Sequence, residues 1–177
     1  MGIGKTAARA ALLGAVGLAV AACGGPPSQV IPCPAIRIPL DTERVTRFAD
    51  GPGRDITDVV MQAEIKFLSG ECSVDEDEIE MTFPIAIRGV RGPADRDGIE
   101  KVDVFLAVTT RGRDVLQRRE LPMTLRFVGN RTSIVSSDFV TIQIPKREDQ
   151  SPKEFLVFLG LKLSKEELEY NRSESGR

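Results

Sequence analysis

The sequence predicts an all-β protein: an antiparallel two-sheet sandwich of immunoglobulin or fibronectin III type, with six to seven strands and a short C-terminal helix. Apolar side chains recur at every second residue in six segments, which is the periodicity of half-buried strands. Glycine, proline and other turn-forming residues separate these segments at short intervals, and helical periodicity is almost absent. A small closed barrel is the alternative architecture.

The expected strands follow one another at short intervals along the chain. They are centred on residues 59–67, 79–87, 102–108, 121–127, 140–144 and 155–163. The last segment is apolar on both faces, which favours a central strand. Pro84 and Pro122 lack an amide donor, so their strands should be edges or carry bulges. Ser164 and Glu167 form a capping-box pattern that predicts the short terminal helix.

Two acidic stretches resemble cation sites only in part. Residues 71–80 hold four consecutive carboxylates, and residues 95–98 read Asp-Arg-Asp-Gly, which is half of a calcium loop. The full loop pattern and its bidentate glutamate are missing, so we interpret both stretches as polar turns. No metal site and no cofactor are expected.

The N-terminal segment has the pattern of an export signal. Lys5 and Arg9 provide positive charge, and the 13 residues from Ala10 to Ala22 are all apolar or small. This run is too short to cross a membrane as a helix, which needs about 20 residues. A basic start, a short apolar run and small residues at its end are typical of a secretory signal peptide.

The end of this segment, Val20-Ala21-Ala22-Cys23, resembles the lipobox of bacterial lipoproteins. That resemblance implies lipidation of Cys23, with palmitate as one of its acyl chains, and cleavage of the chain before it. Several acyl chains on one residue hold a protein stably at a membrane. An ordinary signal peptide followed by an incidental cysteine is the alternative. Gly24 follows the cysteine where an aspartate would indicate retention at the inner membrane. We therefore expect the periplasmic face of the outer membrane.

The expected organisation has four parts. They are a signal peptide at 1–22, the lipidated cysteine with a Pro/Gly-rich tether at 23–34, a sandwich with its terminal helix at 35–172, and a disordered tail at 173–177. Two cysteines remain after Cys23, and an even pair in an exported protein suggests a disulfide between Cys33 and Cys72. Two separate buried thiols or a metal pair are the alternatives.

The chain also resembles a family of small uncharacterised proteobacterial envelope lipoproteins. The residues that carry the resemblance are Cys33-Pro34, Gly51–Asp55, Ser69–Cys72 and Ser164–Arg172. The family has no assigned activity, so the resemblance implies only the location and the fold.

Composition limits the chemistry that the chain can perform. It contains no histidine, which excludes Ser-His-Asp and Cys-His catalytic arrangements and histidine-based metal sites. Its net charge is −2, without a basic stripe, so nucleic acid is not an expected partner. We therefore expect that the protein is not an enzyme.

Four arginines around one expected hairpin form the main basic feature: Arg111, Arg113, Arg118 and Arg119. They are candidates for contact with anionic lipid headgroups, where each charge contributes about 1 kcal/mol. A solvated hairpin tip is the alternative.

Two functions remain after these exclusions. The first is a non-catalytic module at the membrane surface that contacts an envelope protein or assembly machine, for example by strand addition. The second is a carrier of lipid or another small molecule in a cavity between the sheets. Large side chains at the expected inner positions are sufficient to fill a core, which favours the interaction module.

Overall fold

The computed structural model describes residues 32–176. The expected signal peptide, Cys23 and most of the tether lie outside the described residues, and processing and lipidation stay predictions. No helix in the described part of the chain combines the length and apolar character needed to span a bilayer.

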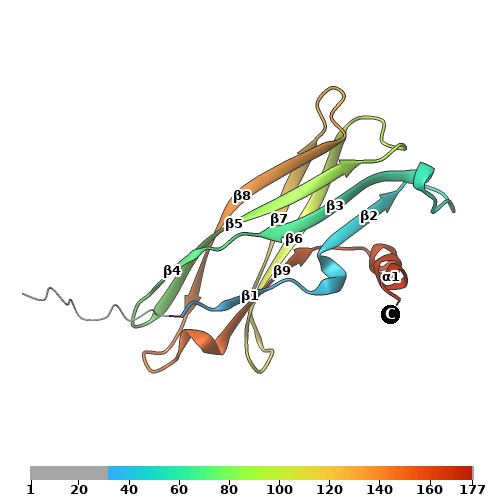
Figure 1. Cartoon of the computed structure of the whole chain (residues 1–177). Helices are drawn as coiled ribbons and strands as arrows, with labels where there is room; N and C mark the ends of the chain where they lie inside the picture. Colours follow the sequence, from blue (N-terminus) through green and yellow to red (C-terminus); the bar gives the residue numbers. More distant parts are fainter. Residues whose placement is uncertain (1–31, 177) are drawn as a thin grey trace, which may run out of the picture. The chain divides into compact units, whose positions relative to one another are not determined.

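Two β-sheets face each other and form a sandwich (Figure 1), as the sequence predicts. The first sheet has the order β1 (Ala35–Arg37), β9 (Phe155–Leu161), β6 (Ile99–Thr110) and β7 (Val115–Arg126). The second sheet contains β2 (Arg44–Phe48), β3 (Val59–Phe67), β5 (Glu78–Arg91), β4 (Glu71–Val74) and β8 (Ser133–Pro145). Neighbouring strands are antiparallel except β1 and β9. The described residues thus form nine strands rather than six or seven. The strands that the sequence did not predict include β1, β2 and β4, which are short.

The space between the sheets is filled by the alternating apolar residues that define the strands. One continuous core contains buried side chains from both sheets, among them Phe83, Ile87, Leu106 and Leu159. Burial of each such side chain contributes about 1.5–3 kcal/mol, so this core is the main source of stability. β9 lies between β1 and β6, which confirms that its two-sided apolar pattern marks an interior strand.

Pro84 lies on β5, which is not an edge strand, and an interruption between β3 and β4 accommodates it. Both strands pair with β5, and Phe67 faces Ile85 while Glu71 faces Thr82. The Leu68 amide donates to the Pro84 carbonyl (3.2 Å), so the side of Pro84 that lacks a donor faces this interruption. The irregularity therefore lies in the strands opposite Pro84. Pro122 lies on β7, an edge strand, as predicted.

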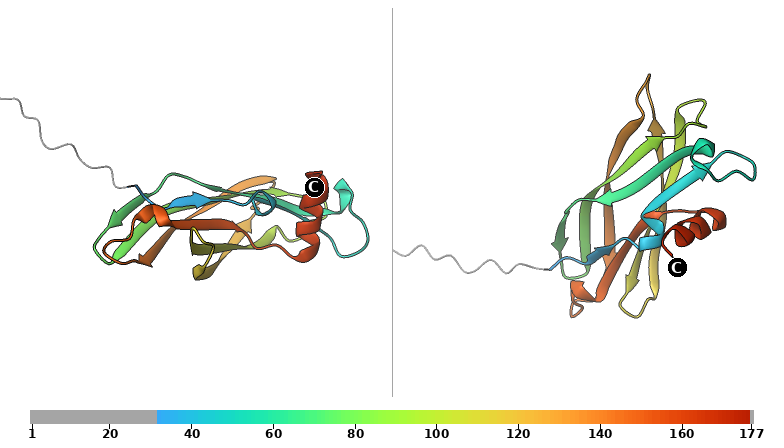
Figure 2. Two further views of the ribbon diagram at one scale, coloured as in Figure 1. Left: turned by 90° about the horizontal axis from the view of Figure 1, so that it is seen from below. Right: turned by 45° about the vertical axis from the view of Figure 1, so that its right-hand side comes forward.

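The helix α1 (Lys165–Glu174) begins at the predicted cap, where the Ser164 hydroxyl accepts a hydrogen bond from the Glu167 amide. It packs beside β2 (Figures 1 and 2) and extends two residues beyond the expected boundary at Arg172. The buried Asn171 side chain donates to the carbonyls of Asp41 (2.9 Å) and Arg44 (2.7 Å). These two hydrogen bonds attach the helix to the segment that leads into β2.

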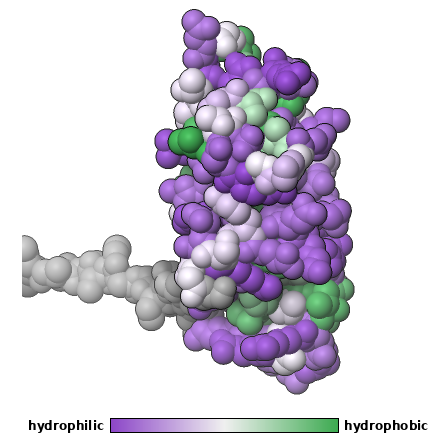
Figure 3. Space-filling view, turned by 90° about the vertical axis from the view of Figure 1, so that its right-hand side faces the viewer, coloured by the Kyte–Doolittle hydropathy of each residue, from purple (hydrophilic) through white to green (hydrophobic). Residues whose placement is uncertain are grey.

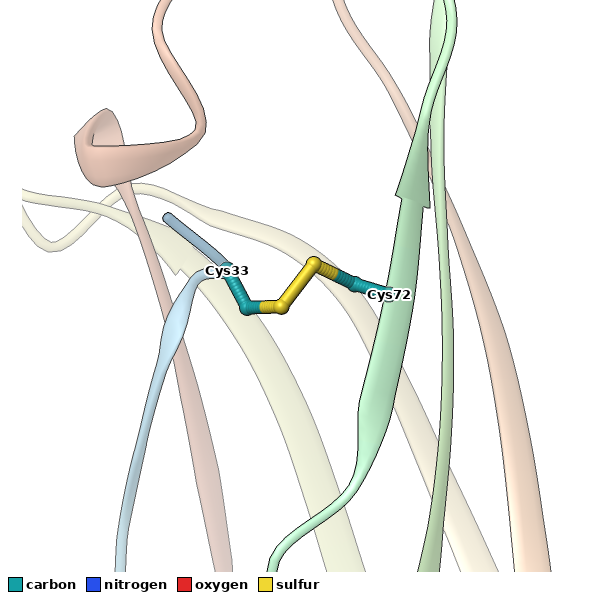
Figure 4. Close-up of a disulfide and its surroundings, with 2 residues drawn as sticks. All are labelled: Cys33 and Cys72. Carbon is teal, nitrogen blue, oxygen red and sulfur yellow. A yellow bond between two sulfur atoms is a disulfide. The ribbon is translucent and has the colours of Figure 1, made fainter. Parts of the chain in front are cut away.

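The predicted disulfide joins Cys33 and Cys72 (Figure 4). Their Cα atoms lie 5.8 Å apart, within the usual range for disulfides. Cys33 precedes β1 of the first sheet, and Cys72 lies on β4 of the second sheet. The disulfide therefore connects the start of the described chain to the opposite sheet.

Candidate interaction site

The four arginines of the predicted anionic-surface contact are distributed along the β6–β7 hairpin. Arg111 and Arg113 lie in the turn, whereas Arg118 and Arg119 lie on β7. Arg111 donates from Nε to the Lys153 carbonyl (2.6 Å), which holds its side chain against the β8–β9 connection. Because consecutive residues of a strand point to opposite faces, Arg118 and Arg119 diverge. The structure brings the four residues into no common cluster, and contact with lipid stays a prediction.

The turn that carries Arg111 belongs to the end of the sandwich near Cys33. The Arg111 amide donates to Glu154 (2.9 Å), and the Lys146 amide donates to Asp77 (2.8 Å). These bonds join the β6–β7, β8–β9 and β4–β5 connections into one surface. Acidic and basic residues are interspersed on it, so it is not a uniformly basic surface for anionic lipid.

The half-calcium sequence forms a turn, as interpreted from the sequence. Three carboxylates approach one another there: Asp95, Asp97 and Glu100. Arg91 donates to Asp95 (2.6 Å), and Arg47 donates to Glu100 (2.9 Å), so arginines already neutralise two of the three. Burial alone raises the pKa of Asp95, but hydrogen bonds from the Gly98 amide and from Arg91 outweigh it and hold the pKa below its usual value. Its role is to shape the turn.

One edge of each sheet lies on the same side of the sandwich. β7 and β8 are edge strands on the same side of the sandwich, joined by residues 127–132, and no backbone pairing connects them. We call the space between their free edges the β7–β8 seam. Two side chains of β7 cross it: Gln117 donates to the Gln143 carbonyl, and Arg119 donates to the Thr141 carbonyl (3.5 Å).

The register identifies which backbone groups of β8 face the β7–β8 seam. Pro84 directs its carbonyl toward β3 and β4, and Phe139 is its partner across the β5–β8 pair. In antiparallel pairs the hydrogen-bonded and non-hydrogen-bonded positions alternate, so the odd-numbered residues of β8 direct their amides and carbonyls away from β5. The carbonyls of Thr141 and Gln143 accept hydrogen bonds from side chains of β7. In residues 133–139, here called the open segment, the backbone groups that face the seam have no partner on β7.

β7 is a poorer edge than β8. Asp103 accepts from the Lys162 amide (2.8 Å) and therefore faces β9, and its partner on β7 is Pro122. Pro122 thus faces the free edge, where it offers no donor. Arg118, Arg119 and Glu120 precede it, and charges and prolines are common protections of natural edge strands.

The open segment lacks most of these protections. It contains no Lys, Arg or Pro, and Asp138 is the only charged residue in all of β8. Val135 and Phe139 point to the outer face and are 66% and 73% exposed. Asp138 points toward the inner side and accepts from the Phe139 amide (2.8 Å). Except for this amide, the open segment is an unprotected strand edge bordered by apolar side chains.

Other exposed apolar residues are scattered over the molecule, for example Leu40, Ile56 and Val128. On the face shown in Figure 3, hydrophilic side chains cover most of the surface and apolar ones form separate patches. Single exposed apolar residues are normal on proteins and need no partner. Val115 and Leu116 are also exposed on the edge strand β7, but Arg118, Arg119 and Glu120 follow them there. The open segment differs because its exposed apolar side chains lie on a free edge with one charged residue, Asp138.

Two hollows follow the β7–β8 seam. One, of about 490 Å³, is lined by Arg126 at the end of β7, by Arg131 in the connection between the strands, and by the start of β8. The other, of about 220 Å³, lies between Leu121 and Phe139, and the core residue Ile85 forms part of its lining. Sequence reasoning missed this site, because Ser136 and Asp138 break the apolar alternation there and the strand was expected only at 140–144.

Comparisons with known proteins add little to this geometry. No protein-family model matches the chain, and no curated protein matches it. A search of solved structures finds the variable (V) domain of the AgI/II polypeptide BspA from Streptococcus agalactiae, at 6% sequence identity and a TM-score of 0.19. The match covers 69% of this chain and 73% of that domain.

Proposed function

We propose that this protein is a lipid-anchored protein of the cell envelope whose β-sandwich is a non-catalytic module for protein interaction or envelope assembly. The open segment of β8 is the observation that carries the proposal. A partner strand can pair with free backbone groups at such an edge, and neighbouring side chains then provide specificity. Anchoring at Cys23, at the periplasmic face of the outer membrane, would present this edge to other envelope proteins.

The difference between the two edges of the β7–β8 seam supports this use. Exposed strand edges promote unwanted association, so proteins protect them with charges, prolines or bulges. β7 has a proline and several charges, whereas β8 has one charge along 13 residues. An edge left unprotected beside a protected one is consistent with a functional contact.

The disulfide supports a position close to the membrane. Cys33 is ten residues after Cys23, a reach of at most about 35 Å for an extended chain. Cys33 is bound to Cys72 in the second sheet, so the tether ends on the folded domain itself. With lipid on Cys23, the sandwich would work within a few nanometres of the bilayer.

The carrier is the second candidate, and the filled core weighs against it. The inner positions of both sheets are occupied by buried Phe, Ile, Leu, Val and Met side chains in one cluster. The two hollows of the β7–β8 seam lie at the surface. Mass spectrometry of lipids extracted from the purified protein tests this candidate, which requires a stoichiometric ligand besides the anchor.

Photocrosslinking in intact cells tests the interaction module. A photoreactive phenylalanine analogue replaces Ser137 in the open segment or, as a control, Arg37, which is exposed on β1 at the opposite edge of the first sheet. We expect one discrete adduct with an envelope protein from position 137 and none from position 37. Equal labelling from both positions, or recovery of monomer alone, would contradict the proposal.

The anchor is tested separately by fractionation of Cys23→Ala. We expect the unmodified protein in the membrane fraction and the variant outside it, with the adduct at position 137 reduced. A Cys23→Ala variant that remains in the membrane fraction would refute the lipid anchor without affecting the claim about β8.

A further inference from the structure

We infer that the open segment of β8 binds an extended, acidic segment of a partner protein as an additional strand of the second sheet, with carboxylates placed against Arg126 and Arg131. This inference rests on the proposed function, because it specifies the partner chemistry of the same surface.

The backbone determines the length and the form of the bound segment. Ser133, Val135 and Ser137 offer both amide and carbonyl at the free edge, whereas Phe139 offers its carbonyl because its amide is bound to Asp138. Beyond Phe139, the side chains of Gln117 and Arg119 occupy the next two carbonyls. The added strand therefore covers about seven residues and ends beside Phe139.

The side chains of the open segment favour a partner with alternating apolar residues. Val135 and Phe139 lie on the outer face, and Pro84 is opposite Phe139 on β5. Cross-strand pairs of apolar and aromatic side chains each stabilise a sheet by about 0.2–1 kcal/mol. A partner strand with apolar residues on the same face would cover both exposed side chains.

The positive charges beside the β7–β8 seam favour a negatively charged partner segment. Arg126 and Arg131 line the larger hollow of the β7–β8 seam, and neither makes an ion pair with any residue in the described range. Farther along β7, the carboxylate of Glu120 is bound to Lys162 (2.6 Å), which lowers the pKa of Glu120. Carboxylates form strong, often bidentate hydrogen bonds with guanidinium groups, so an acidic segment complements this rim.

The same charges disfavour a second copy of this chain as the occupant. A β8–β8 contact would place a strand with a single carboxylate, Asp138, against the seam. Such a strand would offer little negative charge to Arg126 and Arg131, whereas an acidic partner would complement both.

Peptide binding to the protein, produced from its full-length gene, tests the inference. The probe is a fluorescein-labelled nonapeptide, Glu-Val-Thr-Val-Glu-Val-Thr-Val-Glu, measured by fluorescence anisotropy. The matched control carries Lys in place of Glu. We expect the acidic probe to bind at least tenfold more tightly, and high salt to weaken its binding.

Two N-methylated probes distinguish strand addition from electrostatic attraction alone. One carries methyl groups on the odd-numbered amides of the peptide and the other on the even-numbered amides. Only one set of amides faces β8 in an added strand, so we expect one probe to lose binding and the other to retain it. Equal loss or equal retention would overturn the strand geometry.

Variants of the chain locate the site. Ser137→Pro removes a free amide without removing a bond to β5, and we expect at least tenfold weaker binding with an unchanged far-UV circular dichroism spectrum. Ser137→Ala keeps the amide and should bind like the unmodified protein. The double variant Arg126→Glu with Arg131→Glu should bind the acidic probe at least tenfold more weakly. Arg37→Glu, far from the seam, should bind it as the unmodified protein does.

Three results would overturn the inference: no probe binds, the acidic and basic probes bind alike, or Ser137→Pro binds normally. Sedimentation velocity provides a further test. A dimer that Ser137→Pro abolishes would identify a second copy as the occupant. Failed peptide binding alongside a discrete adduct from position 137 in cells would refute the acidic segment while leaving the proposed function intact.

Discussion

Asp95 shows how a single buried carboxylate determines the shape of a turn. Its side chain is 1% exposed and accepts from Arg91 and from the amides of Asp97 and Gly98. These bonds organise the connection between β5 and β6, which belong to different sheets. The residues that resemble a calcium loop are therefore used to connect the two sheets.

We expect Asp95→Asn to lower the free energy of unfolding at pH 7 by about 1.5–3 kcal/mol, the usual contribution of a hydrogen bond to a charged group. The pKa of Asp95 is lowered in the folded protein, so its ionised form stabilises the fold above the unfolded-state pKa, near 4. This stabilisation is lost as the pH falls through the folded-state pKa.

Urea denaturation at pH 7 and at acidic pH measures both effects. The difference between the variant and the unmodified protein should shrink as the pH falls below 4. Asp50→Asn, at an exposed position, should stay within about 0.5 kcal/mol of the unmodified protein. Equal stability of Asp95→Asn and the unmodified protein at pH 7 would show that the turn does not depend on the carboxylate.

Asn171 has a similar role in the terminal helix, where its buried side chain organises the contact with the segment before β2. Asn171→Ala removes its two hydrogen bonds to the carbonyls of Asp41 and Arg44 and leaves both without this donor. We expect a loss of about 2 kcal/mol and faster amide exchange in α1, measured by denaturation and hydrogen exchange. Exchange in α1 that stays unchanged would mean that other contacts hold the helix.

At the level of the elements, the interruption between β3 and β4 depends on Gly70. A Cβ atom at this position would collide with the Thr82 carbonyl and with Phe83, both on β5. Backbone and core atoms cannot move aside, so Gly70→Ala should destabilise the protein by about 1–3 kcal/mol. Gly112→Ala is the matched control, because its Cβ would make contacts no shorter than 3.4 Å. Equal effects of the two substitutions would contradict this account.

The strands that the sequence predicts well are those with long apolar alternation. β3 has the expected bounds, and β5, β6 and β9 contain or closely match the expected segments, because their inner faces are continuous and apolar. β4 was interpreted as part of an acidic turn, and β2 has charged residues at two of five positions. Pairing with β5 and β3 forms these two strands, and that pairing is a long-range property that no local pattern reports.

The candidate site was less accessible to prediction for the same reason. The first half of β8 has polar residues at two of its three inner positions, Ser136 and Asp138, where the strand borders the β7–β8 seam, so its apolar alternation is incomplete. The arginines that the sequence groups together are separated by the alternation of β7 and by the bond from Arg111 to Lys153. Only the sheet order shows that β7 and β8 are neighbouring edges.

At the level of the whole molecule, the disulfide connects the tether to both sheets. Its cysteines are 39 residues apart, and closure of a loop of this length stabilises a fold by about 4 kcal/mol in the chain-entropy model. We expect Cys33→Ser with Cys72→Ser to lower the unfolding free energy by about this amount while leaving the β-sheet circular dichroism signal in place.

Reduction of the unmodified protein is the control for this prediction and should reproduce the loss of stability. A double variant as stable as the oxidised protein would show that the disulfide only positions the tether.

The proposed function requires an open edge at β8, and residue-resolved hydrogen exchange measures that edge most directly. We expect the amides of Ser133, Val135 and Ser137 to exchange rapidly in the free protein, and those of Ile134, Ser136 and Asp138, which face β5, to exchange slowly. Addition of the acidic probe should slow the first set and leave the second unchanged. Slow exchange of both sets in the free protein would mean that the edge is already covered and would contradict the account.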